Sequence, residues 1–165
     1  MMKHSSSYIT QIYHGRKVFS LLEMKVLRVV MGQSGDFSVF LNDTEEKMVL
    51  PIAIGPFEAQ SIALALQGIT PPRPLTHDLI TSICHALDVT VEKILITDIS
   101  EGIFYANIHM MRGDRIFVID ARPSDAIALA VRCNAPIYMA PRLVEFTYRY
   151  EDIVFSDQED SETSY

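Results

Sequence analysis

The 165-residue chain has no apolar stretch of the length that a membrane-spanning helix needs, which is roughly 18 or more residues. The segment from Met1 to Arg16 also lacks the continuous apolar stretch and the small-residue cleavage site of a secretory signal. We therefore expect a cytoplasmic protein without membrane partners.

Cysteine is scarce, since Cys84 and Cys133 are the only two in the chain. They do not form a Cys-x-x-Cys motif, and both lie in apolar surroundings. This pattern disfavours a disulfide framework and a zinc site. We expect two buried free thiols.

Positive charge is neither abundant nor concentrated, and the net charge is −7. Four acids fall in the last ten residues, which contain no Lys or Arg; without them 14 basic residues face 17 acidic ones. A protein that binds nucleic acid tightly usually carries a dense basic patch. The composition therefore argues against that class, but it allows an enzyme that contacts nucleic acid briefly.

The same order of three strands and one helix occurs twice along the chain. Alternating apolar residues and turn residues predict six strands, and prolines at the first helical position predict helices that begin at Pro56 and Pro123. The strands are predicted at residues 22–31, 37–41, 48–54, 91–99, 103–111 and 115–120. We predict an α+β fold of duplicated β-β-β-α units, with a mainly antiparallel sheet packed against helices.

Three further features refine this prediction. Pro51 cannot donate to a strand ladder, so its strand is either an edge strand there or interrupted. Between the two units, Thr76 is the predicted N-cap of a helix over 77–87, and a last short strand is predicted over 135–139. The first helix should bury an apolar face of Ala59, Ile62, Ala63 and Leu66.

Composition divides the chain into three segments. Residues 1–20 are predicted to be a weakly ordered lead-in, and residues 21–155 form the folded domain. Residues 156–165 are acidic and almost free of apolar side chains, so we expect a disordered tail.

Two polar motifs stand out, Arg73-Pro-Leu-Thr-His-Asp78 and Asp120-Ala-Arg-Pro-Ser-Asp-Ala126. Together with Leu50-Pro-Ile-Ala-Ile-Gly55, Glu58-Ala59 and Phe104-Tyr-Ala106, they resemble a bacterial single-domain member of the bifunctional nuclease (BFN) domain family. The resemblance implies that the folded domain is BFN-like. It also implies nuclease activity, which is ascribed to plant members on both RNA and DNA and is inferred by similarity for bacterial ones.

Phosphodiester hydrolysis needs an activated water, neutralised phosphoryl oxygens and a stabilised leaving group, often with help from a divalent metal held by carboxylates. The two motifs contain the residue types for this chemistry. The candidates are Asp120, Asp125, His77 and Glu58 for catalysis, Arg73 and Arg122 for substrate binding, and Asp120, Asp125 and Asp78 as ligands of Mg²⁺ or Mn²⁺.

The acidic candidates have structural alternatives. Glu58 and Asp125 lie in predicted first helical turns, where an acid can cap open amides and complement the helix dipole, worth about 0.3–1 kcal/mol. Asp120 ends an apolar strand, where it can serve chemistry, cap the following helix or pair with Arg122.

The other candidates are equally open. Arg73 and Arg122 each precede a proline in extended backbone, which suits phosphate recognition, but Arg73 can instead pair with Asp78 and Arg122 with Asp120. His77 can be a general base or a hydrogen-bonded structural histidine.

The recognisable residues cluster at three predicted helix N-termini, near Pro56, His77 and Pro123. If the fold brings these ends together, amide dipoles and arginines favour phosphate there, whereas the acids repel it. A nuclease site would then require Mg²⁺ or Mn²⁺; otherwise the acids are only caps.

Two competing functions remain. A non-catalytic binding or regulatory module of an oligomeric cytoplasmic protein is favoured by the sparse positive charge and by the lack of a standard nuclease motif. An oligomeric scaffold is suggested by the apolar strand segment Ile94-Leu-Ile96. For the nuclease we expect RNA or DNA as a transient partner, and in each case a homo-oligomer.

Overall fold

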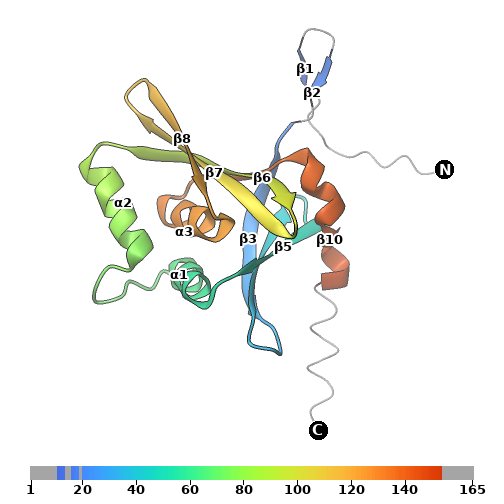
Figure 1. The fold of residues 1–165 in the computed structure, drawn as a ribbon, viewed down its shortest axis with the longest axis horizontal. Helices are drawn as coiled ribbons and strands as arrows, with labels where there is room; N and C mark the ends of the chain where they lie inside the picture. The colour runs from blue at the N-terminus through green and yellow to red at the C-terminus, as the bar shows by residue number, and fades with distance from the viewer. Residues whose placement is uncertain (1–10, 14–15, 19, 154–165) are drawn as a thin grey trace, which may run out of the picture.

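The computed structural model describes residues 11–13, 16–18 and 20–153. Its main feature is an eight-stranded sheet in the order β10-β5-β4-β3-β9-β6-β7-β8 (Figure 1). Neighbouring strands are antiparallel except β6 and β9, which are parallel. The bounds are β3 (Leu22–Met31), β4 (Phe37–Asp43), β5 (Met48–Ile54), β6 (Thr90–Ser100), β7 (Ile103–Arg112), β8 (Arg115–Ala121), β9 (Ile137–Met139) and β10 (Tyr148–Arg149).

Three α-helices accompany this sheet, α1 (Pro56–Leu66), α2 (Thr76–Ala86) and α3 (Pro123–Cys133), together with the 3-10 helix η1 (Pro141–Phe146). The predicted α+β class and the mainly antiparallel sheet are confirmed. Every predicted strand is present. In strands such as β6 and β7 the period-2 alternation matches a sheet with one buried face, whereas β8 is exposed along most of its length. β10 and η1 lie within the predicted domain but were not predicted as elements.

Each of the two meanders, β3-β4-β5 and β6-β7-β8, leads into a helix, and the two meanders flank β9 in the sheet. The order of elements is the one predicted for duplicated units. Strand order alone does not establish a common origin, so the duplication stays a prediction.

The N-terminal lead-in contains an antiparallel pair of short strands, β1 (Gln11–Tyr13) and β2 (Arg16–Val18). The rest of the predicted lead-in up to residue 19, and the predicted acidic tail at 156–165, lie outside the described residues. Among the described helices, none has the length and apolar character needed to cross a lipid bilayer.

Helix α3 is the centre of the core. It packs on β6 and β7 and contacts both α1 and α2, while α1 also packs on β3 and β4. Residues 126–130 of α3 are buried, and three of them are alanines, which lets the helix approach its neighbours closely. Full burial of a larger side chain such as Ile94 or Leu41 stabilises the fold by about 1.5–3 kcal/mol.

Two predictions about the helices need correction. Leu66 is 43% exposed rather than part of the buried face of α1, because the last turn of that helix leads into an exposed loop. Thr76 is not the N-cap of α2 but its first helical residue, and Leu75 is the N-cap. The Leu75 amide instead donates to the Asp78 carboxylate at 2.8 Å, so the acid at the third helical position satisfies the end of the helix.

Pro51 lies in β5 opposite Phe40 of β4. On the other side of β5, β10 pairs only with Met48 and Val49. Pro51 therefore faces the free edge of the sheet. Of the two predicted alternatives, an edge strand or an interrupted strand, the first is correct. Cys84 and Cys133 are free thiols as predicted, although each is only half-buried.

Candidate functional site

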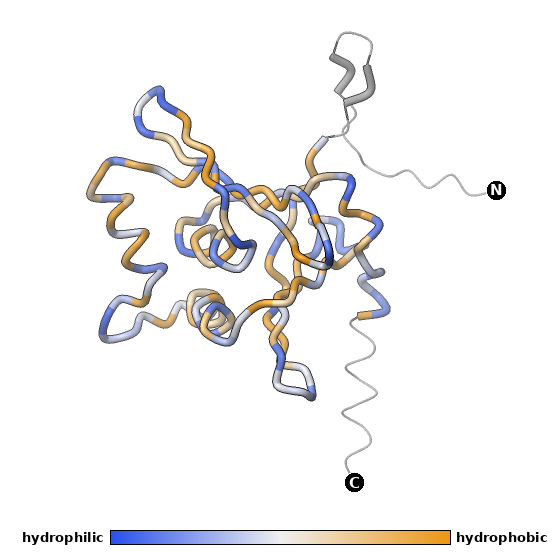
Figure 2. The backbone as a smooth tube through the Cα atoms, in the orientation of Figure 1, coloured by the Kyte–Doolittle hydropathy of each residue, from blue (hydrophilic) through white to orange (hydrophobic). Residues whose placement is uncertain are grey.

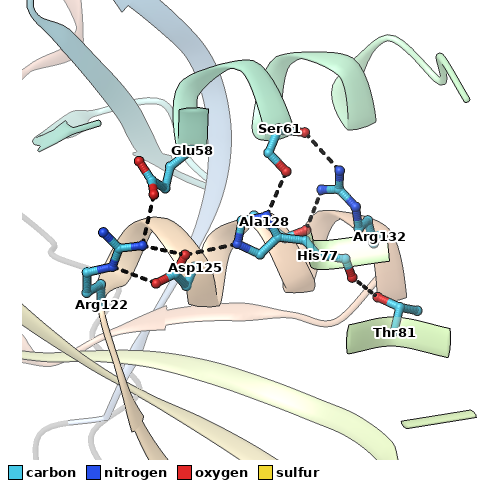
Figure 3. A network of polar contacts seen from close by, with 8 residues as sticks. All are labelled: Glu58, Ser61, His77, Thr81, Arg122, Asp125, Ala128 and Arg132. Carbon is cyan, nitrogen blue, oxygen red and sulfur yellow. Dashed lines mark hydrogen bonds and ion pairs between the residues drawn. The ribbon is translucent and has the colours of Figure 1, made fainter. Parts of the chain in front are cut away.

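The N-termini of α1, α2 and α3 converge, as the nuclease hypothesis required (Figure 3). β5 leads through Gly55 into α1, and β8 leads through Arg122 into α3. In a flat sheet these two strands would lie about 29 Å apart. Arg122 nevertheless reaches Glu58, because α1 and α3 pack against each other over the sheet.

Arg122 is the N-cap residue of α3 and bridges two carboxylates. Its Nε and Nη2 donate to Asp125 at 2.7 and 3.1 Å, and Nη2 also donates to Glu58 at 2.9 Å. These hydrogen bonds, first to Asp125 and then to Glu58, raise the pKa of Arg122. Because its side chain remains 65% exposed, the guanidinium is a fixed positive charge that still faces solvent.

Asp125 and Ser61 bind opposite sides of the His77 ring (Figure 3). His77 Nε2 lies 2.9 Å from Asp125 Oδ1, and Nδ1 lies 2.8 Å from Ser61 Oγ. A neutral imidazole that donates from Nε2 to Asp125 is left with Nδ1 to accept the Ser61 hydroxyl proton. The result is a hydroxyl–imidazole–carboxylate chain of the type used for proton transfer.

The charge state of Asp125 follows from competing effects. Burial raises the pKa of its carboxyl, but hydrogen bonds and charge from Arg122 and His77 outweigh burial and lower the pKa overall. Asp125 therefore stays ionised at neutral pH, as an acid that orients a histidine must.

Local helix geometry places these groups. Glu58 and Asp125 occupy the third helical position of α1 and α3, and His77 the second position of α2. Ser61 lies three residues after Glu58, so both side chains share one face of α1. Gly55 makes room for Glu58, because a side-chain carbon at Gly55 would collide with the Glu58 carboxylate.

A second ion pair lies behind the first. Arg132 Nε donates to Asp78 Oδ1, and Nη2 donates to the Ser61 carbonyl at 3.2 Å. Only 9% of the Arg132 side chain is exposed. The hydrogen bond from Arg132 is the largest cause of a lowered Asp78 pKa. Arg132 thus joins α3 to both other helices beside the His77 chain.

The structure brings together Glu58, His77, Arg122 and Asp125 among the predicted site residues. Asp120 is exposed at the end of β8, and its carboxylate forms no hydrogen bond or ion pair with another described residue. The pairing of Arg122 with Asp120, considered as an alternative role, does not occur, because Arg122 binds the acids of the helix ends.

The alternative pairing of Arg73 with Asp78 does not occur either, because Arg132 binds Asp78. Arg73 is exposed in the loop before α2 and makes no hydrogen bond or ion pair with another residue in the described part of the chain. Ser61 and Arg132 are site residues that the sequence prediction missed. A signal existed for both: each lies on the same helix face as a predicted acid, three residues after Glu58 and seven after Asp125.

Among the described residues, the side chains that could bind a metal ion are not gathered at one point. Within the described ranges, no group of three or more His, Cys, Asp or Glu side chains is placed to hold a metal ion. The predicted ligands Asp120, Asp125 and Asp78 are not gathered into one group, and Asp125 and Asp78 are each bound to an arginine. Arg122 occupies the place between the carboxylates where a cation would otherwise neutralise them.

A pocket of about 250 Å³ opens at this network. Phe57, which is 80% exposed, lies on its wall and was not predicted as a site residue. Arg122 also lines a second hollow of about 410 Å³ between the ends of β5 and β7. The residues around the first pocket are Phe57, Glu58, Gln60, Ser61, Leu75, Thr76, His77, Arg122 and Asp125.

Fold and site together define a class: an α+β domain whose polar site is built from the first turns of three helices. Residues 39–149 match the family described as the bifunctional nuclease domain, and the chain belongs to this family. The resemblance that the two sequence motifs predicted is confirmed.

Two kinds of relative are similar to this chain. An uncharacterised protein of Mycobacterium tuberculosis (strain ATCC 25618 / H37Rv) is 37% identical over 143 residues, which cover 86% of this chain and 83% of that protein. Bifunctional nuclease 1 of Oryza sativa subsp. indica is 29% identical over 101 residues, which cover 58% of this chain but only 30% of the rice protein. A bifunctional nuclease of Oryza minuta matches to the same extent.

Proposed function

We propose that this protein is a nuclease that hydrolyses phosphodiester bonds of RNA or DNA in the pocket beside Arg122. The observation that carries the proposal is the exposed Arg122 guanidinium at the junction of three helix N-termini, next to the His77 chain. Helix N-termini and arginine both favour phosphate. The name of the rice relative supports the same class of reaction.

His77 is the proton acceptor in this mechanism. Ser61 is 3% exposed, so its oxygen is poorly placed for direct attack on a polymer. A pocket water attacks phosphorus and gives its proton to Ser61 Oγ, which passes its own proton to His77 Nδ1. The bond from phosphorus to the leaving oxygen breaks, and the proton held by the imidazolium returns through Ser61 Oγ to that oxygen. Asp125 stabilises the imidazolium, and Arg122 neutralises a phosphoryl oxygen.

Phe57 supports nucleic acid as the substrate. An aromatic ring that is 80% exposed beside a phosphate site offers a surface on which a base can stack. Such stacking is worth about 1–3 kcal/mol per base and tolerates any sequence. The chain carries a net charge of −7 and no dense basic run, so electrostatic attraction to nucleic acid is weak. Stacking on Phe57 would supply binding energy for a substrate that binds briefly.

The sequence predicts a need for Mg²⁺ or Mn²⁺, and the assay of the proposed activity therefore includes each ion. Glu58 and Asp125 are both bound by Arg122, and the proposed proton transfer uses only Ser61, His77 and Asp125. A divalent cation remains the usual source of further charge neutralisation at a phosphoryl centre.

The test is hydrolysis of fluorescent single-stranded RNA and DNA with Mg²⁺, Mn²⁺ or EDTA. Arg122→Ala and Asp125→Asn should each lose activity while circular dichroism shows a folded protein. Arg142→Ala is the matched control, because Arg142 is equally exposed and pairs with Asp98 away from the pocket. Activity that persists unchanged in both site variants would come from a contaminant and would reject the proposal.

A non-catalytic binding module is the second candidate, and one observation favours it. Arg122 is already paired with two acids in the free protein, as expected of a structural ion-pair network. In that case wild-type protein is inactive under every metal condition, yet Arg122→Ala still weakens binding of a labelled oligonucleotide.

A further inference from the structure

β8 is an exposed edge strand of the sheet. Every residue from Arg115 to Asp120 is exposed, although four consecutive ones are large and apolar. Figure 2 shows this hydrophobic stretch behind the hydrophilic tip of the β7–β8 hairpin. The exposed fractions are 72% for Ile116, 42% for Phe117, 56% for Val118 and 45% for Ile119.

The outer side of β8 lacks the features that normally prevent edge-to-edge pairing. Proteins protect edges with prolines, bulges, lysines or very short strands. β8 contains no proline or lysine, and its register with β7 is regular over seven residue pairs. The opposite edge is protected, because β10 has only two residues and β5 carries Pro51. β8 therefore presents unpaired backbone groups and apolar side chains together.

We propose that β8 pairs antiparallel with β8 of a second copy of this chain, with Val118 on the twofold axis. A twofold axis perpendicular to the sheet makes the pairing antiparallel and sets each residue against one on the same face. With Val118 on the axis, Phe117 lies opposite Ile119 of the second copy, and this apolar pair occurs twice. Val118 meets its own counterpart.

Charge selects this register over its neighbours. A shift of the axis to Phe117 would set Asp114 directly against Asp120 of the second copy, and like charges in opposite positions destabilise a sheet. A shift to Ile119 would place Phe117 against Ala121 and Val118 against Asp120, and the Phe117–Ile119 pair would be lost. With Val118 on the axis, only Ile116, towards the start of the strand, meets Asp120. In that register neither Asp114 nor Asp120 lies opposite another acid. A second copy thus fits the strand better than an arbitrary apolar partner does, because the strand complements itself.

Cross-linking tests the register. Val118→Cys should form a disulfide dimer under mild oxidation, because the two Cα atoms on an antiparallel axis lie about 4.5–5.5 Å apart, within disulfide range. Ile116→Cys is the matched control, since its counterpart lies four residues away along the strand. Wild type, oxidised in parallel, reports any cross-link through Cys84 or Cys133. A disulfide dimer of Ile116→Cys but not of Val118→Cys would overturn the pairing.

The oligomeric state in solution tests whether β8 forms the dimer interface. Light scattering should give a dimer for wild type and a monomer for Val118→Lys, which changes an exposed residue and leaves the fold intact by circular dichroism. Leu79→Lys on α2 is the control, because Leu79 is 54% exposed and should leave the dimer unchanged. A wild-type monomer at high micromolar concentration, or a dimer that survives Val118→Lys, would disprove the proposal. Neither result depends on whether the protein is a nuclease.

Discussion

At the scale of single residues, Asp125 connects two other site residues, because it accepts hydrogen bonds from both Arg122 and His77. Asp125→Asn removes the charge from a partly buried network, so the free energy of unfolding should fall by about 1–3 kcal/mol. Urea titration measures the change. Asp98→Asn breaks the exposed pair with Arg142 and should cost less than about 1 kcal/mol. Equal losses in the two variants would show that the site network contributes no more to the free energy of unfolding than an exposed ion pair does.

Two lowered pKa values, those of Asp78 and Asp125, predict acid sensitivity. A carboxyl whose folded pKa lies below its unfolded value stabilises the fold above the ordinary Asp pKa of about 3.9. This contribution is lost as pH falls through the folded value. The free energy of unfolding should therefore drop as pH falls from about 5 towards 2. In Asp78→Asn the dependence should be shallower, and a curve parallel to wild type would contradict the assignment.

At the scale of elements, Arg132 connects α3 to α2 through Asp78 and to α1 through the Ser61 carbonyl. Arg132→Met should destabilise the fold by about 2–4 kcal/mol, because Asp78 is left without its partner. Adding Asp78→Leu should recover part of that loss, and the double-mutant cycle gives the coupling between the two. Additive losses would mean that the pair contributes no more than its separate side chains.

Element types were predictable from local patterns, whereas some contacts between elements were not. Alternation over Leu22–Met31 and a proline at the first position of α3 suffice for a strand and a helix start. The predicted N-cap of α2, Thr76, was wrong because the Asp78 carboxylate, and not the Thr76 side chain, accepts the hydrogen bond at the start of the helix. The partners of Arg122 were not foreseen: Asp120 and Asp125 lie two and three residues from it, so sequence distance does not separate them, and Glu58 lies 64 residues away. Convergence of helix ends was anticipated only as a condition, since the packing of helices against each other has no local signature.

At the scale of the whole molecule, the proposed β8 pairing would bring the hairpin tip of one copy close to the Arg122 pocket of the other. With Val118 on the twofold axis, Arg115 lies opposite Ala121 of the second copy, one residue from Arg122 of that copy. The sheet would continue across the dimer, and the hairpin tip, with Arg112 and Arg115, would add positive charge beside the other copy's pocket. A chain with no basic run of its own would in this way assemble a more basic site.

Arg115→Ala tests this consequence, which requires both the nuclease site and the dimer. Binding of a labelled single-stranded RNA to the Asp125→Asn protein, followed by anisotropy at several salt concentrations, should weaken several-fold when Arg115 is removed. The slope of log affinity against log salt should fall by about 0.7, the value for one phosphate contact on a single strand. The same substitution in monomeric Val118→Lys should have no effect, because Arg115 then lies beside no second pocket. An equal effect in monomer and dimer would place Arg115 against RNA bound to its own chain and exclude the shared site, while leaving the dimer and the Arg122 pocket intact.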